Sequence, residues 1–210
     1  MRNWDILDET GVCRANEDYK DAQIVCNELN IPLHEVNFVK EYWNNVFCNL
    51  MKEYQTGYTP NPDILCNKYI KFDLFYKYAV NKLGADAIAT GHYARTSFGD
   101  YLEHFMAGES ERLIYNADQM IVHVNVFLDV RLLVANDETK DQTFFLCQVQ
   151  QEALRRTMFP LGSIKKADVK RIAMDNNFEK LALKRESMGI CFIGPRNFQD
   201  FIAEVTINTS

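Results

Sequence analysis

The sequence lacks three features that would assign it to a broad class at once. No apolar run approaches the roughly 20 residues of a membrane-spanning helix. Its first residues, Met1 to Asp5, match neither a secretory signal nor an Arg-rich transit peptide. Basic residues are not in excess, because 23 Lys and Arg stand against 29 Asp and Glu, for a net charge of −6. Proteins held to nucleic acid mainly by phosphate contacts are usually basic, so a nucleic-acid role would depend on local basic patches.

The six cysteines form neither a disulfide framework nor a zinc site. They show no C-x-x-C pair and no histidine at zinc-like spacing. This pattern favours free thiols in a reducing compartment, and no structural metal is predicted.

The periodicity of apolar residues predicts the order of the elements. Helices are expected over 18–29, 40–54 and 67–83, and short strands over 33–39 and 87–90. Helices that alternate with strands are typical of an α/β fold, in which an open, mainly parallel sheet is flanked by helices. At 210 residues the chain can bury one good core.

The later part of the chain divides into two further regions. Residues 96–139 are strand-like and irregular, and further helices are expected over 140–154 and 165–177, with a short last helix near Phe198. The predicted organisation is therefore a partial α/β domain over 1–95, a divergent insertion over 96–139, and a helical region over 140–210.

Two cysteines lie in polar surroundings that suit thiol chemistry. Cys66 follows Asp63 and precedes Asn67 and Lys68, and Cys191 lies in the segment E-S-M-G-I-C-F-I-G. A thiol reacts as its thiolate, which cationic or hydrogen-bonding neighbours stabilise. The alternative is that each is a small buried hydrophobe, the usual fate of a free cysteine.

The segment before Cys66 is predicted to be a stiff loop. Pro60 and Pro62 restrict the backbone, so Asn61 is held extended and the Asn61 and Asp63 side chains are presented at fixed positions. Cys66 is then expected near the N-terminus of the next helix, where the helix dipole lowers a thiol pKa.

His92 is the histidine best placed for function. It follows Gly91 directly after the predicted strand at 87–90, and α/β sheets bind their ligands at the carboxyl ends of strands. The alternative is a loop histidine that only hydrogen-bonds nearby backbone.

Together these segments resemble the tRNA 2-thiouridylase family, whose members are ATP-dependent enzymes that replace the 2-oxygen of the wobble uridine with sulfur. The motifs T-P-N-P-D-I-L-C-N-K-x-I-K-F and G-I-C-F-I-G, in this order, are highly specific. The other similar segments are 11–13, 41–43, 83–95, 140–146 and 186–198. The sequence of residues 1–12 is most similar to the mitochondrial branch of this family.

The resemblance implies an adenine nucleotide alpha hydrolase-like fold with a small helical tRNA-binding region. It implies that Cys191 bears a persulfide, that Cys66 closes a disulfide with it as sulfur is delivered, and that Asp63 is the acid/base residue. It further implies that Asn61, Pro62 and Asp63 surround the flipped-out uracil.

The same resemblance implies the ligands and partners. His92 and a second contact formed by Lys140, Asp141 and Gln142 would touch tRNA, and Met1 and Gly91 would line the ATP site. ATP would be accompanied by Mg²⁺, sulfur would come from an upstream persulfide donor, and the expected location is mitochondrial. No membrane partner is predicted.

The chain departs from the family in three places. The phosphate-binding motif S-G-G-x-D-S does not occur, residues 97–139 do not follow the family, and the C-terminal β-domains are expected to be absent. The resemblance therefore predicts a chain truncated at both ends, with weak ATP binding and no thiolation of tRNA on its own.

Two other functions stay open at this point. One is a general thiol or persulfide-carrying redox protein, although no C-x-x-C motif supports it. The other is a non-catalytic fragment that binds tRNA or a partner, which the missing phosphate loop favours.

Overall fold

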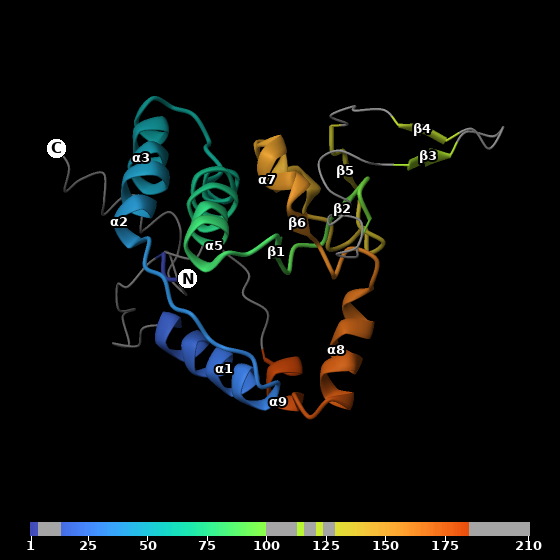
Figure 1. Ribbon diagram of the computed structural model, residues 1–210. Helices are drawn as coiled ribbons and strands as arrows, with labels where there is room; N and C mark the ends of the chain where they lie inside the picture. The colour runs from blue at the N-terminus through green and yellow to red at the C-terminus, as the bar shows by residue number, and fades with distance from the viewer. Residues whose placement is uncertain (4–13, 100–112, 116–120, 124–128, 185–210) are drawn as a thin grey trace. The chain divides into compact units, whose positions relative to one another are not determined.

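The computed structural model describes residues 1–3, 14–99, 113–115, 121–123 and 129–184 (Figure 1). The chain forms two compact units. Unit 1 comprises Met1–Ile70 and Lys170–Ser210, and unit 2 comprises Lys71–Val169. The architecture is a mixed α/β one, with several helices and small open sheets.

A helical rod forms much of the core of unit 1. It consists of α2 (Val39–Tyr42), the π-helical turn η1 (Trp43–Phe47) and α3 (Cys48–Gln55), which follow one another without a break. This confirms the helix predicted over 40–54. Its buried side chains include Val46, Phe47, Leu50 and Met51, which keep the predicted apolar period.

The next helical rod begins earlier than predicted. It consists of α4 (Pro62–Cys66), the π-helical η2 (Asn67–Phe75) and α5 (Tyr76–Leu83), and α4 packs against η1. The rod ends at Gly84, whose φ of 69° is a left-handed conformation that glycine adopts without a steric penalty.

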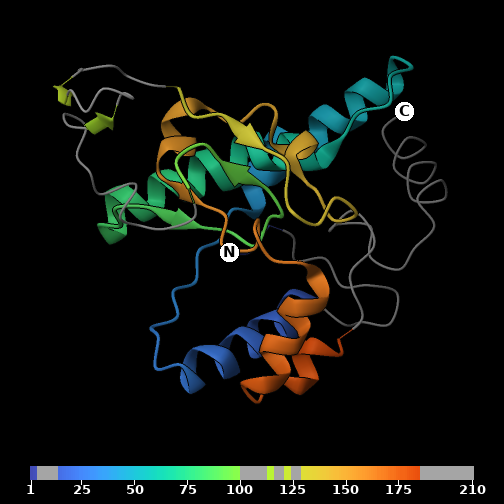
Figure 2. The ribbon, with the colours of Figure 1, turned by 90° about the vertical axis from the view of Figure 1, so that its right-hand side faces the viewer.

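Helix α1 (Arg14–Glu28) lies beside the short α9 (Glu179–Ala182) in unit 1 (Figure 2). Lys184, just after α9, donates to Asp18 at 2.8 Å and to Asp21 at 2.6 Å on α1. Arg2 forms an isolated parallel bridge with Asn37. The strand predicted over 33–39 is thus reduced to this bridge among the residues described.

The sheets of unit 2 differ from the single, mainly parallel sheet that was predicted. One pair is parallel, β1 (Ile88–Ala89) with β6 (Thr157–Met158). Two pairs are antiparallel: β2 (Arg95–Thr96) with β5 (Leu132–Leu133), and β3 (Leu113–Tyr115) with β4 (Ile121–His123). Within the described ranges the prediction of an α/β fold holds, but one open sheet is not formed.

The helices of the later chain are shorter than predicted. The stretch 140–154 contains a 3₁₀-helix, η3 (Thr143–Leu146), and a separate α7 (Gln151–Arg155). Helix α8 (Lys166–Asp175) confirms the helix predicted over 165–177 to within two residues at each end. The helix predicted near Phe198 lies outside the described residues.

The core of unit 2 joins α5 to the strand segments. Its buried members are Phe72, Tyr76, Ala79, Ile88, Ala94, Val130, Leu146, Ala153, Leu154 and Phe159. Figure 1 shows β1 leading away from the end of α5 and running beside β6. This core fixes the backbone that follows β1, where Gly91 and His92 lie. Among the described residues, no helix combines the length and apolarity needed to cross a bilayer.

Candidate functional site

Asn61 caps the helix on which Cys66 lies. Its side-chain oxygen Oδ1 accepts hydrogen bonds from the backbone amides of Asp63 at 3.0 Å and Ile64 at 3.3 Å. Its backbone is extended, with φ −114° and ψ 105°, as predicted from the flanking prolines. Pro62 occupies the first helical position, where its missing N–H costs nothing.

The prediction of a stiff loop through Asp63 is therefore wrong at its end. Pro62 and Asp63 belong to the first turn of α4, and Cys66 is its last residue before the rod continues as η2. The physical reason is that Asn61 and Pro62 form a helix-start signal, which outweighs the loop character of the two prolines. Since helix-end effects fall off within one turn, the N-terminal dipole acts on Asp63 more than on Cys66.

Cys66 is buried, with 5% of its surface exposed. The Asn3 side-chain nitrogen Nδ2 lies 4.0 Å from its sulfur, a weak N–H···S contact. The Asn3 side-chain oxygen Oδ1 is buried and has no hydrogen-bond partner among the residues that the structure describes. Unpaired buried polar atoms are uncommon in proteins. The Cys66 sulfur is therefore shielded from solvent and lies beside a side chain that can still accept a hydrogen bond.

His92 is held at the end of β1 in unit 2. Its Nδ1 lies 2.9 Å from the Thr90 hydroxyl, and its Nε2 lies 3.4 Å from the Lys71 ammonium nitrogen. Its ring contacts those of Phe72 and Phe159, at centroid distances of 5.6 Å and 6.3 Å. Burial first, and the Lys71 charge second, lower the pKa of His92 from 6.5 to about 3. The imidazole is therefore neutral at physiological pH.

The predicted contact at 140–142 lies against the segment that follows His92. The backbone amide of Gln142 donates to the Tyr93 carbonyl at 2.8 Å, and the Tyr93 amide donates to the Gln142 side-chain oxygen at 3.0 Å. The structure thus brings together two segments that were predicted separately, one containing His92 and one containing Gln142.

Asp141 organises its own loop. Its carboxylate accepts from the Ala135 amide at 2.7 Å, and from the Thr143 amide at 3.1 Å and hydroxyl at 2.8 Å. Both carboxylate oxygens thus accept hydrogen bonds from Thr143, the first residue of η3. Lys140 is partly exposed beside them, so it is the member of this trio whose cationic group suits a phosphate contact.

The two residues predicted to line an ATP site lie in different units. Met1, in unit 1, is 45% exposed and precedes the Arg2–Asn37 bridge. Gly91, in unit 2, is exposed. A Cβ placed on Gly91 would meet only Leu161 at 3.8 Å, so the backbone there is open to an approaching group.

Lys71 is a residue that sequence reasoning missed. It lies within the helix predicted over 67–83, and a lysine on a helix is ordinarily solvated. The available signal was its place in the I-K-F end of the Cys66 motif. Cys191 lies outside the described residues. Within the described ranges, no group of three or more His, Cys, Asp or Glu residues is arranged to hold a metal ion.

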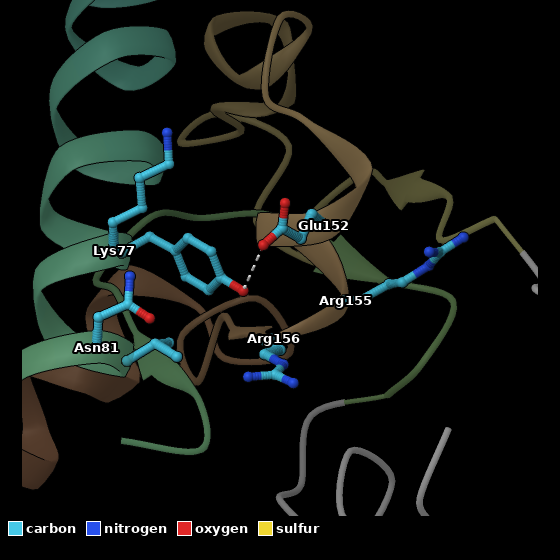
Figure 3. Close-up of a pocket in the computed structure, with 7 residues that line it drawn as sticks. Lys77, Asn81, Glu152, Arg155 and Arg156 are labelled. Carbon is cyan, nitrogen blue, oxygen red and sulfur yellow. Dashed lines mark hydrogen bonds between the residues drawn. The ribbon is translucent and has the colours of Figure 1, made fainter. Parts of the chain in front are cut away.

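A separate cavity of about 360 Å³ opens beside α5 and α7 (Figure 3). It is lined by Tyr76, Lys77, Val80, Asn81, Glu152, Arg155 and Arg156. The Tyr76 hydroxyl donates to Glu152 across it at 3.5 Å. None of the predicted site residues that the structure describes lines this cavity, so it is distinct from the His92 region.

Comparison with known proteins assigns the chain to a family. The family described as tRNA methyl transferase HUP domain matches residues 1–195. The chain is 54% identical to the human mitochondrial tRNA-specific 2-thiouridylase 1 over 97% of its length, and 50% identical to the Drosophila melanogaster protein of that name over 97%. It covers 48% of each, so it spans about half the length of these relatives. A HUP domain implies an adenine nucleotide alpha hydrolase-like fold that binds ATP.

Proposed function

Because the chain belongs to the tRNA methyl transferase HUP domain family, we propose that its protein carries out ATP-dependent 2-thiolation of the wobble uridine of tRNA. The observation that supports this most directly is its 54% identity to a human mitochondrial tRNA-specific 2-thiouridylase over nearly the whole chain.

The proposed reaction has an activation step and a sulfur-transfer step. The 2-oxygen of the uracil attacks the α-phosphorus of ATP, an O–P bond forms, and pyrophosphate leaves. The terminal sulfur of a persulfide on Cys191 then attacks C2 of the uracil and displaces AMP. Asp63 takes up the proton released by the sulfur nucleophile.

Cys66 completes the sulfur transfer. Its thiolate attacks the Cys191 sulfur and breaks the S–S bond to the delivered sulfur, which leaves 2-thiouridine and a Cys66–Cys191 disulfide. A dithiol reductant restores both thiols, and an upstream persulfide donor recharges Cys191. The weak N–H···S contact from Asn3 supports this role, since a hydrogen-bond donor beside the sulfur stabilises its thiolate.

The tRNA contacts are assigned to both units. In unit 1, Asn61, Pro62 and Asp63 surround the flipped-out uracil, and the Asn61 cap supports this role by holding the segment rigid. In unit 2, His92 contacts the tRNA together with the 140–142 segment. The paired hydrogen bonds between Gln142 and Tyr93 support a shared surface there.

The ATP site is assigned to Met1 and Gly91, with Mg²⁺ as the counter-ion of the phosphates. The open backbone at Gly91 supports close approach of a nucleotide. Magnesium usually takes most of its ligands from phosphate and water, so it needs few ligands from the protein itself. The similarity to mitochondrial 2-thiouridylases supports a mitochondrial location.

The test uses cells from which the gene has been deleted. Wobble 2-thiouridine in mitochondrial tRNA is measured by mass spectrometry after the whole protein encoded by the gene is returned. We expect Cys66→Ser and Cys191→Ser to abolish the modification. The matched controls Cys48→Ser and Cys147→Ser, which change exposed free cysteines, should retain it. Full modification in the Cys66→Ser cells would refute the proposed chemistry.

A further inference from the structure

Lys71 is partly buried and has no acidic partner among the described residues. Partly buried Arg155, in contrast, pairs with Asp129 at 3.4 Å, and the more exposed Lys77 and Lys184 also pair with aspartates. The only polar partner of the Lys71 ammonium among the described residues is the neutral His92 ring, at 3.4 Å. A sheltered cation without a counter-ion is costly unless an anion is supplied to it.

The nearest carboxylate along the chain does not supply that anion. Asp73 is two residues further on the same helix, and residues at that spacing do not face each other. Its carboxylate is already paired with Lys77, one turn later. No carboxylate in the described part of the chain therefore compensates the positive charge of Lys71 where it meets His92.

His92 is arranged to orient Lys71. An ammonium group only donates hydrogen bonds, so the Nε2 that faces it must be the unprotonated nitrogen. The proton of the neutral ring is then on Nδ1, which donates to the Thr90 hydroxyl at 2.9 Å. Contacts with Phe72 and Phe159 fix the plane of the ring. One N–H of Lys71 is thus engaged, and two remain for other acceptors.

The position of this pair is where a ligand is expected. Thr90 and His92 follow β1, and open α/β sheets bind ligands beyond the carboxyl ends of parallel strands. Between them, Gly91 has open backbone. Gly91 is also exposed, so a ligand can approach the main chain directly beside His92.

We propose that Lys71 is a phosphate-binding residue, oriented by the positioning residue His92, and that it contacts a phosphate group of ATP or of the tRNA. The assignment rests on the proposed function, since both substrates of that reaction bring phosphate. Lysine suits the role as a compact point charge with several donors. A Lys71–His92 pair that served only to pack the helix against the strand would need no charge on Lys71.

The experiment measures two affinities separately in the whole protein encoded by the gene. ATP binding is measured by calorimetry, and binding of an unmodified tRNA transcript by filter retention across a series of salt concentrations. Lys71→Met should weaken one of the two by about tenfold, the loss expected for one charged hydrogen bond. Lys71→Arg should restore part of it. Lys82→Met, which changes an exposed lysine on the same rod, should change neither affinity.

The pattern of loss identifies the source of the phosphate. Loss of ATP affinity alone assigns Lys71 to the nucleotide. Loss of tRNA affinity, with the slope of log K against log salt reduced by about 1, assigns it to the RNA backbone. A packing role would not move the salt slope. If Lys71→Met does not fold, Lys71→Gln is measured in its place.

Double substitution tests the link to His92. If His92 orients Lys71, His92→Phe should weaken the same affinity, and the loss in the double variant should be smaller than the sum of the two single losses. Wild-type protein that binds neither ligand would refute the proposed function, and the assignment of Lys71 with it. Wild-type protein that binds both, while Lys71→Met and Lys71→Gln bind equally well, would refute the assignment of Lys71 alone.

Discussion

The sharpest test of the His92 environment is the pH dependence of stability. In the folded protein the pKa of His92 is about 3, against 6.5 for an ordinary histidine, chiefly because the ring is buried. Between these two pH values the unfolded chain binds a proton at this ring that the folded chain does not. Stability should therefore fall as the pH drops below 6.5, by about 1.4 kcal/mol per pH unit from this residue. Above pH 6.5 the ring is neutral in both states and contributes no slope.

The substitution His92→Gln removes this contribution while every other titratable group stays. Between pH 6.5 and pH 5 the wild-type protein should lose about 2 kcal/mol more than the variant, since the interval covers about 1.5 units at that slope. Urea unfolding of both proteins at pH 7, 6 and 5 measures the difference. An equal loss in both proteins, or an imidazole NMR signal that titrates near pH 6.5 in the folded protein, would refute the reasoning. Lys71→Met should raise the His92 pKa only part of the way back toward 6.5, because burial lowers this pKa more than the Lys71 charge does.

Three further predictions concern the helix cap, two glycines and the buried thiol. Asn61→Ala should lower the melting temperature by about 2–4 °C through loss of a cap worth about 1 kcal/mol, whereas Asn61→Asp should keep it; equal melting of all three proteins would contradict the cap. Gly162→Ala should lower the melting temperature because its Cβ would lie 1.9 Å from a backbone oxygen, whereas Gly91→Ala should not; a stable Gly162→Ala would show that this backbone yields easily. In the native protein, iodoacetamide should modify Cys66 more slowly than the exposed Cys48 by mass spectrometry, and equal rates would contradict the burial of Cys66.

The helices were largely predictable from the sequence because their signal is local. The apolar period over 40–54 and 165–177 gives helices that end within two residues of the predicted bounds. The start of α4 was missed by five residues because two prolines suggested a loop. The correct signal was present in the order of Asn61 and Pro62, a cap followed by a first helical residue.

The sheet and the 140–154 stretch were less predictable because their bonds are non-local. Strand β2 pairs with β5, which lies in the region read only as strand-like. The stretch 140–154 breaks where polar side chains take backbone partners elsewhere. Gln151, for example, exchanges two hydrogen bonds with the backbone of Val130. Such side-chain bonds compete with a continuous helix, and the apolar period alone does not reveal them.

The same non-local bonds explain why Lys71 was missed and how the proposed site in unit 2 is assembled. In the segment 90–93, His92 contacts Lys71 of the second helical rod, and Tyr93 hydrogen-bonds to Gln142 of a loop distant in the sequence. Two adjacent residues thus tie together three parts of the chain that the sequence separates by 20 residues or more. Because Gln142 bonds the Tyr93 backbone at both its amide and its side chain, its tRNA role and its structural role are linked. Substitution of Gln142 should therefore disturb the position of His92, and through it that of Lys71, even when no RNA is bound.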